Sequence, residues 1–198
     1  MPEPSDQTAF HSLEGQFLVA ETELGDPNFT ETVVLIINHD EEGAFGLVIN
    51  RKSDISLGDA APNYRESALA GIPLYIGGPV EQEYLFTIHS GLPEDFRSPH
   101  ARQVCPGVVF EPSFAHVERF LIDEARQSPP ELRLFAGYSG WGPGQLEGEM
   151  EAHAWITIPA EAALVFNPHP AQGWKAALRK KGGVYWVVAE TGYKPSLN

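Results

Sequence analysis

The segment GYSGWGPGQLEGE, residues 137–149, combines flexible turns with side chains that could bind a ligand. It follows a predicted strand and leads into a candidate helix from residue 144 onward, the geometry in which backbone N–H groups bind phosphate. However, no Lys-Ser or Lys-Thr pair follows it, and its glycine spacing does not match the dinucleotide-binding motif. Its closing glutamates would also repel a phosphate. We therefore interpret it as a structural turn in which Trp141 is buried and Gln145 holds the loop by hydrogen bonds.

Ser139 and His89 are the side chains closest to a catalytic pattern. In GYSG the second glycine comes one residue too early for a G-x-S-x-G nucleophile elbow, so Ser139 is a weak candidate nucleophile. His89, in the run HSG at the end of a predicted strand, would suit a general base near neutral pH. The alternative that we favour is a histidine that hydrogen-bonds the neighbouring loop.

Metal binding would need ligands that this sequence does not group. The seven histidines are scattered, and neither an HExxH motif nor a Cys/His pair is present. Only folding would bring His89, His153 and Glu149 together. The run NHDEEG lacks the spacing of an EF-hand and is typical of a solvated hairpin turn. We expect no metal and no cofactor.

The composition indicates an acidic, foldable chain. Of its 198 residues 42 % are hydrophobic, and its formal charge is 13 − 27 = −14. This charge disfavours direct nucleic-acid binding, which needs clustered cations. The one dense basic run, LRKKGG at 178–183, is typical of the last turn of a helix before a glycine stop.

Cysteine content and hydropathy indicate the compartment. The single cysteine, Cys105, excludes an internal disulfide and is expected to be a buried, inert thiol. No segment approaches the ~20 apolar residues of a membrane span, and the N-terminus lacks a signal-peptide pattern. We therefore expect a cytoplasmic protein without membrane contact.

The hydrophobic pattern predicts an α+β fold with a mixed sheet. Residues 1–14 are expected to be flexible, and residues 15–198 to form a single domain. Two hairpins are expected, one through HDEEG and one in which 83–90 returns beside 73–80. The nearly continuous apolar strands indicate a sheet that is covered on both faces or curled on itself. Predicted strands cover 15–21, 32–38, 44–50, 73–80, 83–90, 107–112, 131–138, 153–159 and 184–190, and predicted helices cover 113–127 and 170–183, with mixed signals over 56–69 and loops over 91–107.

Three blocks together resemble the AlgH/YqgE family of bacterial proteins, also called UPF0301. They are VVLIINHDEEGAFGLVINRK, YIGGPVEQEYLFTIHSG and GYSGWGPGQLEGEMEAHAW. With GWKAALRKKGG, the likeness covers about residues 15 to 191. The signature positions of the family correspond here to Asn50, Gly77, Gly78, Pro79, His89, Gly140, Trp141, Gly142, Pro143, Gly144, Gln145, Leu146 and Glu149.

The resemblance implies a single α+β domain with a mixed, partly curled β-sheet flanked by helices. Some members of the family are described as candidate transcriptional regulators, and no reaction is established for it. The chain departs from the family pattern at Ser139, where alanine is usual, and at His153, near a position that is often asparagine.

A ligand pocket would form if the second hairpin strand ended beside the glycine turns. It would offer backbone donors and an indole wall in a concave polar site. The candidate pocket residues are Asn50, Arg51, Gly77, Gly78, Pro79, His89, Ser90, Trp141, Gly142, Gly144, Gln145 and Glu149.

Three functions remain open. The residues best fit a non-enzymatic regulatory or interaction protein that acts through protein partners, since no catalytic set has the correct spacing. The alternative is an uncharacterised enzyme or small-ligand-binding protein that uses the turns around His89, Trp141 and Glu149. A direct DNA-binding transcriptional regulator is the least favoured, because no helix-turn-helix with a basic recognition helix is visible.

Overall fold

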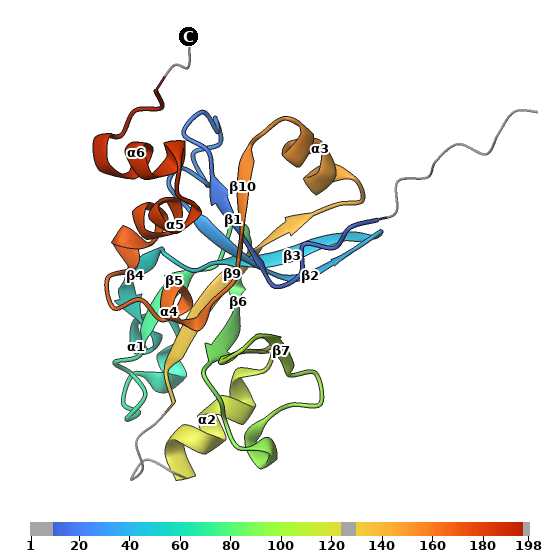
Figure 1. The fold of residues 1–198 in the computed structure, drawn as a ribbon. Helices are drawn as coiled ribbons and strands as arrows, with labels where there is room; N and C mark the ends of the chain where they lie inside the picture. Colours follow the sequence, from blue (N-terminus) through green and yellow to red (C-terminus); the bar gives the residue numbers. More distant parts are fainter. Residues whose placement is uncertain (1–9, 124–129, 196–198) are drawn as a thin grey trace, which may run out of the picture.

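The structure, a computed structural model, describes residues 10–123 and 130–195. A large curled sheet lies at its centre, and helices flank it (Figure 1). The strands are β1 Gln16–Ala20, β2 Val33–Asp40, β3 Gly43–Val48, β4 Lys52–Ser56, β5 Pro73–Ile76, β6 Val80–His89, β7 Arg102–Cys105, β8 Val108–Glu111, β9 Leu132–Trp141 and β10 Trp155–Pro159. The helices are α1 Leu57–Ala60, α2 Phe114–Asp123, α3 Gln145–Glu151, α4 Ala162–Val165, α5 Gly173–Lys181 and α6 Val184–Thr191.

The strands form one mixed sheet in the order β10-β1-β2-β3-β9-β6-β8-β7, with β5 and then β4 attached through β9. The pairing of β5 with β9 is parallel, and the other pairings are antiparallel. The sheet is a curled half-barrel, so the prediction of a single α+β domain with a mixed, partly curled sheet is confirmed. The hairpin through HDEEG is confirmed as well, because β2 and β3 pair from Val34↔Val48 to Asp40↔Gly43.

Both faces of the sheet are buried where the sequence is continuously apolar. On β2, Val33, Leu35 and Ile37 face the main core, where α4, α5 and α6 contribute residues. Val34 and Ile36 face a second core that contains residues of α3 and β10. A third cluster lies under α2. Since a strand packed on both faces needs apolar residues at every position, coverage of both faces explains the run VVLII.

The predicted second hairpin is wrong, because β9 lies between β5 and β6. Strand β5 pairs with β9 through Leu74↔Leu134, and β6 pairs with the other edge of β9. The chain crosses β9 at Gly77–Gly78, where a Cβ on Gly78 would lie 2.2 Å from the carbonyl carbon of Tyr138. Only residues without a side chain permit this approach, so the glycines that suggested a hairpin turn instead allow a crossing.

The predicted strand over 184–190 is also wrong, since these residues form the helix α6. Its run VYWVVAE is apolar and rich in β-branched and aromatic residues, a pattern that cannot distinguish a strand from a buried helix. Val188 and Ala189 pack into the main core, and α6 lies against α5. Gly192, at a φ of 77°, ends the helix in the left-handed conformation typical of a C-terminal glycine. Tertiary packing therefore outweighs the β propensity of this segment.

Smaller differences concern short elements and termini. Strand β4 was not predicted, and β7 lies inside the segment predicted as loops. Cys105 is half-buried rather than buried, because it ends the edge strand β7, and partial burial raises the pKa of its thiol. Helix α2 begins directly after Ser113 as predicted, whereas 124–127 of the predicted helix lie outside the described residues. Helix α5 ends in a basic turn followed by Gly182, as predicted.

The N-terminal segment predicted to be flexible falls partly outside the described residues, which begin at residue 10. Within the described part, the hydroxyl of Ser12 donates to the carbonyl of His39 at 2.8 Å. The N–H of Leu13 donates to Nδ1 of the His39 ring at 3.0 Å. Among the helices that the structure describes, none combines the length and apolar character needed to cross a bilayer.

Candidate functional site

The signature turn after β9 is held by the carboxylate of Glu149. Its Oε2 accepts the indole N–H of Trp141 at 2.9 Å and that of Trp155 at 2.7 Å. Its Oε1 accepts the side-chain amide of Gln145 at 3.1 Å. Phe29 packs edge-on against Trp155 with ring centroids 5.3 Å apart. The carboxylate thus joins β9, α3 and β10, and we call these four polar side chains, Trp141, Gln145, Glu149 and Trp155, the indole clamp.

The glycines of this turn shape the backbone at the start of α3. Gly144 adopts a φ of 72°, a conformation that an L side chain would strain. The N–H of Gly142 donates to the side-chain oxygen of Gln145 at 3.1 Å, so Gln145 ties the loop as predicted. Trp141 is buried, also as predicted. In the first turn of the same helix, Glu147 Oε1 lies 2.9 Å from His39 Nε2.

The Gly77–Gly78–Pro79 corner packs against the backbone of β9 without leaving a space. A Cβ on Gly77 would lie 2.2 Å from the carbonyl oxygen of Gly137. The hydroxyl of Ser139 is buried and donates to the carbonyl of Gly77 at 3.2 Å. Ser139 is therefore engaged in structure, and the corner meets the signature turn as packed backbone.

Asn50 and Arg51 anchor the loop between β1 and β2. The amide of Asn50 accepts from the N–H of Val33 at 2.8 Å and donates to the carbonyl of Glu31 at 2.9 Å. The guanidinium of Arg51 donates to the carbonyls of Asn28 at 2.6 Å and Thr30 at 3.2 Å. Both residues also line a hollow of about 540 Å³ beside residues 168–172.

His89 lies in the interior, at the inner end of β6. Its Nδ1 accepts the N–H of Leu92 at 3.1 Å, which is the hydrogen bond to the neighbouring loop that the sequence suggested. Ser90 ties this turn to the segment before β9, because its hydroxyl accepts the N–H of Glu131 at 3.0 Å. Within the described residues, His89 Nε2 and the buried hydroxyl of Thr87 have no hydrogen-bond partner. Burial lowers the pKa of His89 from its ordinary 6.5 to about 4.

This shift predicts a loss of stability in mild acid. The pKa of His89 is lower in the folded state, so the unfolded state binds more protons between pH 6.5 and 4. The stabilisation by the neutral ring is complete above pH 6.5 and is lost as the pH falls toward 4. Between pH 7.5 and pH 5 we expect the free energy of unfolding to fall by about 2 kcal/mol more in the wild type than in His89→Asn.

Urea unfolding of both proteins at the two pH values measures this difference. Asparagine keeps an acceptor for Leu92 but does not titrate, and the other acidic and basic groups are common to both proteins. Equal pH dependence in the two proteins would show that His89 is not held neutral.

The candidate pocket residues thus occupy four places. Trp141, Gly142, Gly144, Gln145 and Glu149 belong to the indole clamp and its turn. Gly77, Gly78 and Pro79 form the crossing over β9, Asn50 and Arg51 anchor a loop, and His89 and Ser90 close an interior turn. Among the described residues, no three His, Cys, Asp or Glu side chains gather in a metal-binding group, and His89, His153 and Glu149 are not joined in one.

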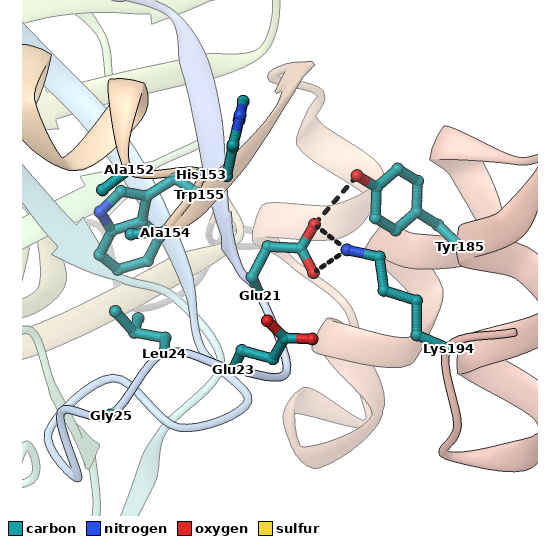
Figure 2. Close-up of a pocket in the computed structure, with 10 residues that line it drawn as sticks. All are labelled: Glu21, Glu23, Leu24, Gly25, Ala152, His153, Ala154, Trp155, Tyr185 and Lys194. Atoms are coloured by element: carbon teal, nitrogen blue, oxygen red, sulfur yellow. Dashed lines mark hydrogen bonds and ion pairs between the residues drawn. The ribbon is translucent and has the colours of Figure 1, made fainter. Parts of the chain in front are cut away.

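A cleft of about 580 Å³ opens beside Trp155 of the indole clamp. It lies between the end of β1, the turn after α3, and α6 (Figure 2). Glu21 follows β1, and its backbone N–H donates to the carbonyl of Ala154 at 3.0 Å. The cleft is lined by Glu21, Glu23, Leu24, Gly25, Ala152, His153, Ala154, Trp155, Tyr185 and Lys194. Trp155, the first residue of β10, belongs to both the clamp and the cleft, so the clamp contributes one side chain to the cleft wall.

The carboxylate of Glu21 organises this cleft. It accepts the hydroxyl of Tyr185 at 2.9 Å and the ammonium of Lys194 at 3.3 Å (Figure 2). Its side chain is largely buried, whereas Glu23 beside it is exposed. Burial, and then the hydrogen bond to Glu21, raise the pKa of Tyr185, so its hydroxyl remains a neutral donor. The contacts fix α6 and the chain after it against β1.

His153 lines the same cleft in a strained conformation. Its φ of 56° lies in the left-handed region, where asparagine is favoured over most other side chains. This preference gives a physical reason for the asparagine that is common near this position in the resembled family. The strained turn directs the chain from α3 into β10.

A match to a protein-family model identifies the family to which the chain belongs. The model described as AlgH-like matches residues 17–186, which include the indole clamp, the crossing over β9 and most of the cleft. The chain belongs to the AlgH-like family.

Individual relatives agree with this assignment over most of the chain. A UPF0301 protein of Streptomyces coelicolor is 36 % identical and covers 98 % of this chain and all of its own length. A UPF0301 protein of Hahella chejuensis is 39 % identical over 88 % of this chain and 92 % of its own. The solution structure of AlgH from Pseudomonas aeruginosa, 30 % identical, gives a TM-score of 0.68 over 98 % of this chain and 100 % of that one. A crystal structure of a protein from Corynebacterium diphtheriae, 26 % identical, gives a TM-score of 0.71 over 88 % of this chain and 90 % of that one.

Sequence reasoning missed the cleft of this AlgH-like protein. Its three central side chains, Glu21, Tyr185 and Lys194, are 164 and 173 positions apart in the chain. The helix that carries Tyr185 was predicted as a strand, so no pattern placed it beside β1. The one available signal was a carboxylate at the end of the first predicted strand, which is too common to indicate a site.

Proposed function

We propose that this AlgH-like protein is a non-enzymatic regulatory or interaction protein of the cytoplasm, and that it receives a basic segment of a protein partner at the Glu21 cleft. The supporting observation is that the chain closing the cleft exposes two large aromatic side chains. Trp186 is 53 % exposed and Tyr193 79 % exposed, and each is the direct neighbour of a residue that lines the cleft. Tryptophan and tyrosine are enriched at the energetic centres of protein interfaces.

The charge of the cleft supports a basic partner. Glu21 is already paired with Lys194, which leaves the exposed carboxylate of Glu23 to attract a cation. The whole chain carries a formal charge of −14, so its long-range field also attracts basic segments and repels nucleic acid. We expect the association to weaken with added salt, because the exposed charges are screened.

The residues of the signature turn have structural roles in this proposal. The indole clamp holds the start of β10, and Trp155 is the residue that the clamp and the cleft share. The crossing over β9 fixes β5 and β6. Variants of the clamp therefore act on stability first, whereas variants of Trp186, Tyr193 and Glu23 act on binding.

Affinity capture from cells with matched variants tests the proposal. We expect a partner that is retained by the wild type and by Tyr84→Ala, which removes a 56 % exposed aromatic on β6. Its recovery should fall about tenfold or more with Trp186→Ala combined with Glu23→Gln, since interface aromatics often contribute about 2 kcal/mol or more. The same difference should appear when the purified partner is added back. Capture of the same proteins by all three forms would exclude the Glu21 cleft as the binding site.

A further inference from the structure

We propose that a third hollow, which shares no lining residue with the Glu21 cleft and is independent of the proposed function, binds a small aromatic carboxylate. The hollow measures about 330 Å³ and lies on the main-core face of the sheet, between the ends of β2 and β3 and the strands β6 to β8. Its apolar wall includes Ile37, Phe45, Phe86 and Phe110, and its rim carries Asn38 and Arg102. Helix α5 contacts β10, β1 and β2 and thus covers a different part of this face.

The wall is a set of aromatic rings from three strands. Phe45 lies 5.5 Å from Phe86 and 5.5 Å from Phe110, measured between ring centroids, and all three pairs of these rings are in contact range. Phe45 and Phe86 are only half-buried, because they border the main core and face the hollow. A flat apolar group placed there would remove this ring surface from water and gain edge-to-face contacts.

Arg102 supplies the charge at the rim. Its Nη1 donates to the carbonyl of Ile37 at 3.0 Å and to the side-chain oxygen of Asn38 at 2.8 Å, which fixes the guanidinium in place. Within the described residues, Nε and Nη2 make no hydrogen bond, so one edge of the guanidinium remains for a ligand. A fixed guanidinium edge is suited to two parallel hydrogen bonds with a carboxylate.

Size and charge select the ligand. The volume is at the lower end of that of small-molecule sites and fits a compound of one or two rings. Glu14 lies 3.5 Å from Nη1 of Arg102 and offsets part of its charge. A single carboxylate therefore suits the rim better than a polyphosphate, which would need several cations.

Titration with 2-naphthoate, followed by amide NMR shifts of the full chain, tests the proposal. We expect saturable shifts in β2, β3, β6 and β8 and a dissociation constant of about 1 mM. Arg102→Gln should weaken binding about tenfold and abolish the preference over neutral 2-naphthalenemethanol. Glu14→Gln should tighten binding about threefold, because it removes the competing carboxylate. Glu23→Gln, in the other cleft, should leave the affinity unchanged.

Arg102 also holds the end of β2, so a second variant separates binding from folding. Phe86→Trp fills the hollow and should abolish naphthoate binding in a protein that is still folded. The proposal is overturned if naphthoate shows no saturable shifts up to 5 mM, or if it binds Arg102→Gln or Phe86→Trp as tightly as the wild type. Tighter binding of a peptide ending in phenylalanine than of naphthoate would also overturn it, in favour of a protein chain end.

Discussion

Replacing Glu149 with alanine is expected to lower the free energy of unfolding by about 3–5 kcal/mol, since two buried indole N–H groups lose their common acceptor. Each buried donor left without a partner costs about 1–3 kcal/mol. Urea unfolding followed by tryptophan fluorescence measures the effect. Glu149→Gln keeps an oxygen for the indoles and should cost less than the alanine variant.

Two comparisons make this prediction specific to the indole clamp. Glu151→Ala removes an exposed carboxylate from the same helix and should change stability by at most about 0.5 kcal/mol. In a Trp155→Phe background, which lacks one of the two N–H donors, Glu149→Ala should cost less than it does alone. A cost of Glu149→Ala below about 1 kcal/mol would mean that the carboxylate does not hold the turn.

The second large effect is expected from Gly78→Ala, which should lower the free energy of unfolding by about 3 kcal/mol or more. The added Cβ would lie 2.2 Å from both the carbonyl carbon and oxygen of Tyr138 and 2.4 Å from the nitrogen of Ser139. These are backbone atoms, so the clash cannot be relieved by a side-chain rotation and the crossing must separate from β9. Amide hydrogen exchange should therefore become faster in β5, β6 and β9.

Gly148→Ala is the matched control for this glycine. Gly148 lies inside α3, and a Cβ there meets no atom within 4 Å. Because alanine has a higher helix propensity than glycine, the free energy of unfolding of this variant should rise by about 0.5–1 kcal/mol. If Gly78→Ala and Gly148→Ala had the same denaturation midpoint, the crossing would not be as tightly packed as the structure has it.

The fold class was predictable because it depends on local patterns. The apolar runs of β1, β2 and β3, the helical spacing after Ser113 and the basic end of α5 each indicate their own element. That β5 and β6 each pair with β9, and not with each other, was not predictable, since β9 begins more than 40 residues further along the chain. Gly77 and Gly78 fit either a hairpin turn or a close crossing, and only the position of β9 distinguishes the two.

The candidate site was predictable only in part. The sequence correctly predicted that Trp141 is buried and that Gln145 ties the loop, because both follow from residue type and short spacing. It did not indicate that Glu149 accepts two indoles, since Trp155 comes from the next strand. The cleft at Glu21 depends on α6, whose continuous apolar run conceals its helical state.

The central claim is that the Glu21 cleft receives a basic segment of a protein partner. Photo-crosslinking in cells tests this claim most directly. A photoreactive phenylalanine analogue placed at position 186 should give a discrete crosslinked protein, and Glu23→Gln should reduce its yield several-fold by weakening the attraction for a cation. The same analogue at position 122, which is exposed on α2, should give no such product. Crosslinking of equal yield from both positions, unaffected by Glu23→Gln, would contradict the account.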